Sequence, residues 1–318
     1  MKDLNSYQRT AITTVFATLF LILVGGLVRA AGAGLGCPDW PTCFGLWIPP
    51  LSSEGLPQGF DPALFNPVHT WLEYINRLTG VIIGLLITAT FLLSFRYRKS
   101  EPIITWCSGA AFVLVLFQGW LGGVVVRSGL EAGMITLHMM LAMVIVNILL
   151  FAAFYASREK FQIELDPSIR SKLLMTAAIL FILTLIQMVL GTQVRELVDI
   201  VKNASEPLPR EMWAEAIDVW LYRIHRSFSW LVVIASGVLT VQIRSKQVPS
   251  RLRWIGSGIL LLVLLQLVLG VGLEWFSMPG LLQLFHLVSA TLLLCMEFVF
   301  LLLIGFPGGG GKGVPEMG

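Results

Sequence analysis

The chain has 318 residues, of which 56% are hydrophobic and only 13% are charged, and its mean hydropathy is +0.81. A soluble domain of this length would need far more charge to cover its surface. The composition therefore excludes a soluble globular protein and indicates an all-α polytopic protein of the lipid bilayer. The net charge of +3 is small, so the distribution of charge matters more than its sum, and no nucleic-acid partner is expected.

Apolar segments of spanning length recur along the whole chain. The first is long enough to cross a membrane and is not followed by a small-residue cleavage motif, so we expect no cleavable signal peptide. Eight transmembrane helices are predicted, at approximately 10–30, 72–95, 103–126, 132–155, 173–194, 219–243, 253–274 and 280–304.

The basic residues of the connecting segments are distributed unequally between the two sides. One side holds Arg29, Arg127, Arg195, Lys202 and Arg210. The other side holds Lys2, Arg9, Arg96, Arg98, Lys99, Arg158, Lys160, Arg170, Lys172, Arg244, Lys246, Arg251, Arg253 and Lys312. Because basic residues favour the cytoplasmic side, both termini are predicted to be cytoplasmic, in the plasma membrane of a bacterium. The long loops 31–71 and 195–218 are then extracytoplasmic.

Four cysteines are present, and two of them lie close together in the first long loop. In an oxidising compartment Cys37 and Cys43 favour a disulfide, which could be a plain loop staple or could take part in redox chemistry. Cys107 and Cys295 lie singly in apolar segments, where a free cysteine is usually a small core residue.

The chain also contains an internal duplication. Three pairs of residues share an offset of 148 or 149: Asn76 and His225, His138 and His286, and Gln118 and Gln266. Such a constant offset indicates two copies of one unit. Four crossings return the chain to its starting side, so we predict two tandem four-helix bundles, 1–160 and 161–305, related by a pseudo-twofold axis along the membrane normal. The glycine-rich residues 306–318 are expected to be a flexible tail.

Three of the four histidines lie near the outer ends of predicted helices, at similar depth. Polar, titratable side chains are costly in a membrane and are usually functional there. His225 and His286 can ligate one metal ion between two helices, and in an apolar bundle haem iron is the fitting metal. Zinc would want four ligands, and no carboxylate or thiolate completes the set; copper is weaker for the same reason.

Several arginines lie near the same outer ends. Arg226 follows one of the proposed ligands directly, and Arg29, Arg127 and Arg195 end their segments on that side. Arginine suits the propionate groups of a haem, although lipid headgroups would explain each of these residues equally well.

The first half has asparagine at one of the two ligand positions. His138 alone would hold a haem there and leave an open coordination position, as oxygen chemistry requires. Glu73 precedes Asn76 by one turn, which suggests proton handling or stabilisation of a cationic intermediate; an interfacial glutamate near water is the alternative. For His69 we favour a distal or entry role, with a surface position or replacement of the missing ligand as alternatives.

Together these features resemble the haem A synthase family, over the chain to about residue 305. The resemblance rests on the eight helices in two halves, the paired histidines, the motif Glu73-Tyr74-x-x-Arg77 and the Cys37/Cys43 pair. It implies an oxidoreductase that converts a methyl group of haem O to the formyl group of haem A, in the assembly of cytochrome oxidase.

The resemblance also implies roles for individual residues. His225 and His286, with Arg226, would hold a haem b that carries electrons. The substrate haem would lie against His138, Asn76, Arg77 and His69, with Glu73 and His138 as the catalytic residues. Cys37 and Cys43 would form a disulfide near the substrate.

The chain departs from the family pattern at two places. Other members carry histidine at the position of Asn76, and a second cysteine pair of some members is absent. These departures keep two rivals open, namely a non-catalytic membrane cytochrome b and a haem-binding handover protein. The partners expected are haem O, an unidentified electron donor, and a haem O synthase or a second copy of the chain.

Overall fold

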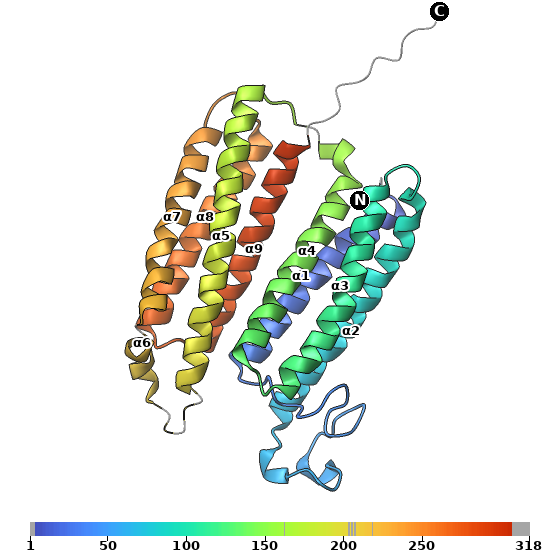
Figure 1. The fold of residues 1–318 in the computed structure, drawn as a ribbon, viewed down its shortest axis with the longest axis vertical. Helices are drawn as coiled ribbons and strands as arrows, with labels where there is room; N and C mark the ends of the chain where they lie inside the picture. Colours follow the sequence, from blue (N-terminus) through green and yellow to red (C-terminus); the bar gives the residue numbers. More distant parts are fainter. Residues whose placement is uncertain are drawn as a thin grey trace, which may run out of the picture.

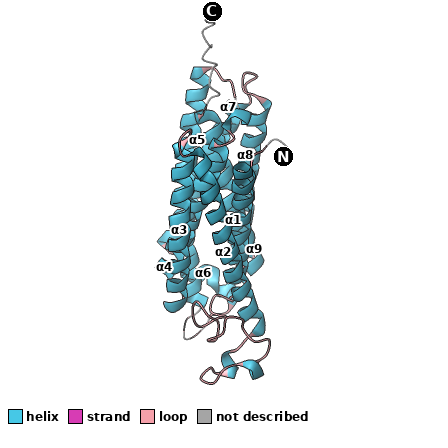
Figure 2. Cartoon of the chain, turned by 90° about the vertical axis from the view of Figure 1, so that its right-hand side faces the viewer, coloured by secondary structure: helices cyan, strands magenta, loops and turns pink. Residues whose placement is uncertain are grey.

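The structure is a computed structural model that describes residues 4–161, 163–202, 204, 206, 208–217 and 219–306. Eight helices in the described part are long and apolar enough to cross a membrane. They are α1 (Ser6–Ala30), α2 (Pro67–Ser94), α3 (Pro102–Arg127), α4 (Ala132–Tyr155), α5 (Pro167–Lys202), α7 (Trp220–Ile243), α8 (Ser250–Trp275) and α9 (Gly280–Gly305). The predicted all-α membrane fold is confirmed, and Figure 2 shows only helices and loops in the described chain.

Short helical segments lie in the connections. They are the 3₁₀ turns Ser53–Gly55, Pro62–Leu64, Phe95–Tyr97, Arg158–Phe161 and Arg210–Met212, and the one-turn helix α6 (Trp213–Ala216). The loop 31–66 and α6 lie at one end of the molecule, and α1 begins at the opposite end, where α9 also ends (Figure 1). We call these the long-loop end and the terminal end.

The helices begin where local chemistry requires it. Asn5 and Gln8 form a capping box at the start of α1, in which each side chain accepts a hydrogen bond from an otherwise unpaired backbone N–H. Asn66 caps α2 by accepting from the backbone N–H of His69. Pro67 and Pro102 occupy first helical positions, where the missing N–H costs nothing. The residue types thus set the starts of these helices.

The helix α5 is longer than predicted. It continues through Lys202, two turns beyond the predicted end at residue 194, so the first part of the expected loop 195–218 is helical. The reason is packing: Val198 is buried with Ile217 and Met278 in a small cluster at the long-loop end. Burying these apolar side chains stabilises the extra turns.

The eight long helices form two rings of four, one from each half of the chain. In the first ring α1 contacts α2 and α4, and α3 contacts the same two helices. In the second ring α5 contacts α7 and α9, and α8 contacts the same two. The rings stand side by side (Figure 1), joined mainly through α1 and α4 on one side and α5 and α9 on the other. A twofold relation would pair α1 with α5 and α4 with α9, in agreement with these contacts, but the axis itself stays a prediction.

Tryptophans mark two levels on the outside of the helices. Near the terminal end Trp106 and Trp254 are 77% and 80% exposed, and near the long-loop end Trp220 and Trp275 are 71% and 76% exposed. Tryptophan collects at the two membrane–water interfaces. These levels therefore delimit the part of the protein that lies in the bilayer.

Candidate functional site

The two histidines of the second half lie on helices that face each other across the bundle. His225 is on α7 and His286 on α9, and each of these helices is flanked by α5 and α8. A planar group between them would have one imidazole on each side.

A glutamine on the preceding helix braces each histidine. The Nε2 of Gln187 on α5 donates to the backbone carbonyl of His225 at 3.0 Å, and Gln266 on α8 donates to that of His286 at 3.0 Å. In the first half Gln118 on α3 donates to the carbonyl of His138 at 2.9 Å. These bonds fix the turn that carries each imidazole.

A glycine one turn after each glutamine makes room for the ring. A Cβ on Gly191 would lie 3.2 Å from Cε1 of His225, and one on Gly122 would lie 3.4 Å from Cε1 of His138. On Gly270 it would lie 3.8 Å from Cε1 of His286. The pattern Gln-x-x-x-Gly thus marks a helix that seats an imidazole.

The corresponding position between α1 and α2 differs from the other three in two residues. Gly25 of α1 faces Asn76 of α2, with a Cβ position 3.7 Å from Oδ1. One turn earlier α1 has Leu21 where the other three helices have glutamine. The first half therefore lacks both the ligand and its brace at this position, and Oδ1 of Asn76 is buried without a hydrogen-bond partner.

The imidazoles fit an axial metal-ligand role. The Nδ1 atoms of His138, His225 and His286 are buried and have no hydrogen-bond partner among the described residues, so no side chain or carbonyl of the described chain competes for that nitrogen of each ring. No group of three or more His, Cys, Asp or Glu that could hold a metal ion occurs among the described residues. A bare zinc site is thus disfavoured, and a group that needs only axial imidazoles suits the geometry.

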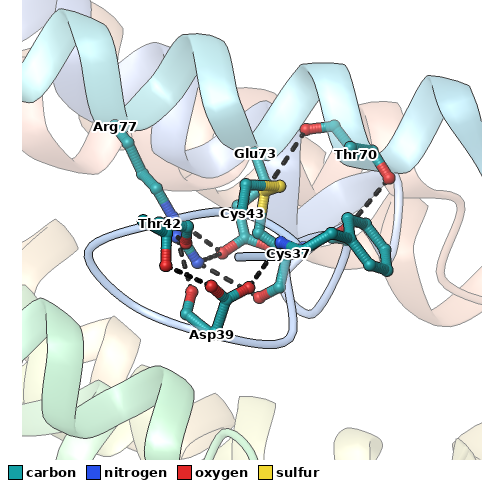
Figure 3. A network of polar contacts seen from close by, with 9 residues as sticks. Cys37, Asp39, Thr42, Cys43, Thr70, Glu73 and Arg77 are labelled. Atoms are coloured by element: carbon teal, nitrogen blue, oxygen red, sulfur yellow. Dashed lines mark hydrogen bonds and ion pairs between the residues drawn. A yellow bond between two sulfur atoms is a disulfide. The ribbon is translucent and has the colours of Figure 1, made fainter. Parts of the chain in front are cut away.

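Next to the Asn76 position, a pair of charged residues holds the first long loop against α2 (Figure 3). Glu73 is 3% exposed. Its Oε2 accepts from the backbone N–H of Cys37 at 2.8 Å, and its Oε1 is paired with Arg77 at 2.5 Å. Glu73 is therefore a buried, ion-paired residue and not an interfacial glutamate near water.

All five N–H donors of Arg77 are engaged within the protein. Besides Glu73, they bond the carbonyls of Asp39 at 2.7 Å, Thr42 at 2.8 Å and Cys37 at 3.1 Å (Figure 3). No donor is left for a carboxylate of a bound haem. In this structure Arg77 clamps the loop to α2, and the expectation that it also contacts the substrate haem stays a prediction.

The clamped loop contains the predicted disulfide between Cys37 and Cys43. Both cysteines are fully buried, beneath Phe44 and neighbouring aromatic rings. Gly36 lies against the backbone of α2 at His69 and Thr70, so closely that a Cβ would collide with it. The disulfide therefore staples the loop, and whether it also takes part in redox chemistry stays open.

The same loop reaches α3 through Trp40. Its indole lies on Gly123, where a Cβ would come within 2.8 Å of Cδ2, and the guanidinium of Arg127 lies 5.8 Å from the ring centroid. The neighbouring Gly122 seats His138. The loop is thus anchored on α2 and α3, beside the turn that carries the histidine.

The last predicted histidine lies at the edge of this site. His69 is in the first turn of α2, half-buried, and its backbone N–H is capped by Asn66. Seven residues separate it from Asn76, about 10 Å along a helix. This placement agrees with an entry position better than with replacement of the missing ligand.

The arginines of the long-loop end are bridged by a carboxylate. Asp199 pairs with Arg29 of the first half and with Arg195 of the second, each at 2.8 Å. The trio carries a net positive charge between the two bundles, and Nε of Arg29 is buried without a hydrogen-bond partner. Arg226 points instead to Glu274, at 3.3 Å, and is largely exposed.

Gln187 was not among the residues predicted from the sequence, and no contact with an imidazole was predicted for Gly122, Gly191 or Gly270. Gln118 and Gln266 each precede their histidine by 20 residues, whereas Gln187 precedes His225 by 38 because a long connection intervenes. The spacing Gln-x-x-x-Gly, which occurs in all three helices, is the signal that could have found them.

A substitution at one of these glycines tests whether the glycine makes room for the imidazole opposite it. Gly191→Val should push the imidazole of His225 out of line and abolish the low-spin haem spectrum expected of bis-imidazole ligation, because the added Cβ already lies 3.2 Å from the ring. Gly237→Val on α7 is the matched control, since nothing lies within 4 Å of its Cβ position. An unchanged spectrum in Gly191→Val would contradict the assignment.

Comparison with known proteins shows what the sequence is similar to. A family model described as cytochrome oxidase assembly protein, COX15-CtaA, matches residues 8–297. The protein named heme A synthase from Orientia tsutsugamushi (strain Ikeda) is 26% identical over 340 residues, which cover 91% of this chain and 93% of the relative. The heme A synthase of Shewanella oneidensis (strain MR-1) is 30% identical over 178 residues, 54% of this chain and 52% of the relative.

Proposed function

Because the chain belongs to the COX15-CtaA family of cytochrome oxidase assembly proteins, we propose that it is a haem A synthase, which oxidises a methyl group of haem O to the formyl group of haem A. The observation that carries the proposal is the asymmetry of the two bundles. Three braced imidazole seats are complete and one is not, so one bundle can hold a haem from both sides and the other from one side only.

In this proposal the second bundle holds a resident haem b. His225 and His286, braced by Gln187 and Gln266, would hold its iron. A haem with two imidazole ligands supplies one-electron transfer when bound. On the side toward the terminal end, a buried apolar cluster of α5, α7, α8 and α9 closes the bundle next to the histidines, and a haem held there would be shielded from water on that side.

The first bundle binds haem O as the substrate. His138 holds it from the side of α4, and Asn76 faces it from α2 without ligating the iron. The amide of Asn76 is smaller than an imidazole, and the residue opposite it on α1 is Gly25, so we infer that this side of the bundle is less filled than the other three positions. Removing four electrons from a methyl carbon needs such an accessible side, because the oxidant has to reach the substrate.

Glu73 is the acidic residue of this site. It lies one turn from Asn76 on α2 and carries the loop with the disulfide. We assign it two tasks: it accepts or donates a proton at its carboxylate during the oxidation, and it positions the loop beside the substrate. His69, at the start of the same helix, lines the entry.

The orientation in the membrane follows the charge distribution. We place the long-loop end outside the cytoplasm of a bacterial cell and both termini inside it, because the basic connections gather at the terminal end. The haem sites then lie toward the outer side of the membrane, where an electron donor of the bilayer or of the outer face can reach the second bundle.

Extraction and mass analysis of haem from membranes that contain the chain and a supply of haem O test this function. Haem A or its hydroxylated precursor should accumulate with the wild type, and Glu73→Ala and His138→Ala should each reduce the yield by at least about 100-fold. His69→Ala should retain conversion, because it is not a ligand in this proposal.

One other outcome would favour a different function. If only haem b and unmodified haem O are recovered from the wild type, the synthase proposal fails. Asn76 is the residue that favours the rivals, an electron-carrying membrane cytochrome b or a haem handover protein, because either needs only the second bundle to be complete.

A further inference from the structure

A polar cavity of about 610 Å³ opens at the long-loop end of the second bundle. Its lining includes Tyr222, Arg223 and Arg226 of α7, Glu274 of α8 and Glu215 of α6. Arg226 is paired with Glu274 at 3.3 Å. The described residues of the lining include two arginines and two glutamates.

The internal duplication identifies what this cavity corresponds to in the first bundle. Tyr222 and Arg226 are the counterparts of Glu73 and Arg77, since 222 − 73 and 226 − 77 are both 149. In the first bundle the disulfide loop fills this place, and its backbone carbonyls take up the donors of Arg77. In the second bundle the guanidinium of Arg226 remains largely exposed.

The surroundings of the cavity are those of a membrane interface. Trp220 and Trp275 flank it in sequence, and they are 71% and 76% exposed. Phe276 is 69% exposed beside them. Such aromatic side chains lie at the level of the lipid headgroups, so the cavity opens where a headgroup lies and where acyl chains can pack on the flanking rings.

From these observations we propose that the cavity binds the headgroup of a phospholipid that carries both a phosphate and a primary ammonium group, as phosphatidylethanolamine does. The phosphate accepts hydrogen bonds from the largely exposed guanidinium of Arg226. The ammonium donates to Glu274 and Glu215, which a choline headgroup cannot do because its nitrogen carries only methyl groups. Because the phosphate would draw Arg226 away from Glu274, an anionic headgroup without the ammonium would leave this carboxylate without its cation.

Native mass spectrometry of the haem-loaded protein tests the proposal. Protein from nanodiscs with equal parts of phosphatidylethanolamine, phosphatidylglycerol and phosphatidylcholine should retain the first lipid in preference to the others. Arg226→Gln and Glu274→Gln should each lower that retention about threefold, the scale of a partly exposed ion pair. Arg253→Gln, at the other end of α8, should leave it unchanged, and soluble phosphoethanolamine should not displace the lipid.

Two results would overturn the proposal. Equal retention of the three lipids, or equal retention by wild type and Arg226→Gln, would show that no headgroup is recognised here. Loss of bound haem from Arg226→Gln would assign the cavity to the haem site instead. Neither result depends on turnover of haem O, so the lipid site and the proposed reaction are tested separately.

Discussion

Arg77→Gln is expected to release the first long loop from α2. The substitution removes the cation from the buried Glu73 and the donors from the carbonyls of Cys37, Asp39 and Thr42. Breaking a buried ion pair by removing one partner costs about 3–5 kcal/mol. The disulfide between Cys37 and Cys43, now fully buried, should then become accessible from the outer side.

The rate of disulfide reduction by a membrane-impermeant phosphine, followed by thiol labelling, measures this release. If reduction requires loop opening, the expected cost corresponds to an increase of at least about 100-fold in rate. Arg226→Gln is the matched control, because this arginine is the repeat counterpart and pairs with Glu274 of α8 rather than with the loop. Reduction of Arg77→Gln at the wild-type rate would show that the clamp does not hold the loop.

Asn76→His combined with Leu21→Gln is expected to complete the fourth imidazole seat. Gly25 already leaves room on α1, and the glutamine introduced in place of Leu21 would brace the backbone carbonyl of residue 76, as Gln187 does for His225. A haem in the first bundle would then be held from both sides. We expect it to become low-spin and to lose the capacity to bind carbon monoxide, which needs a vacant coordination position.

The carbon monoxide difference spectrum of the reduced protein checks this expectation, and the conversion of haem O should fall at least about tenfold in parallel. Leu21→Gln alone is the control, since it adds the brace without the ligand and should leave carbon monoxide binding intact. Persistence of that binding in the double variant would mean that residue 76 does not face the iron.

The sequence alone determined the membrane class, the eight crossings and the histidines of interest. These features depend on local properties: an apolar run of about 20 residues has one stable way to satisfy its backbone in lipid, whatever its neighbours are. The disulfide was also predictable, because Cys37 and Cys43 are only six residues apart in a loop. The duplication was visible because His138 and His286 keep a fixed distance in sequence from the glutamines that brace them.

The tertiary structure decided what the polar residues contact. Arg77 donates to three backbone carbonyls of the loop. Every residue has a backbone carbonyl, so the sequence does not indicate which ones an arginine will contact, and the clamp could not be inferred from it. Gln187 was not predicted because the long connection between α5 and α7 makes its spacing from His225 differ from the 20 residues that separate the other two glutamines from their histidines. The extra turns of α5 depend on Ile217 and Met278, which are distant in sequence. Contacts of this kind are set by how helices pack, which local periodicity does not specify.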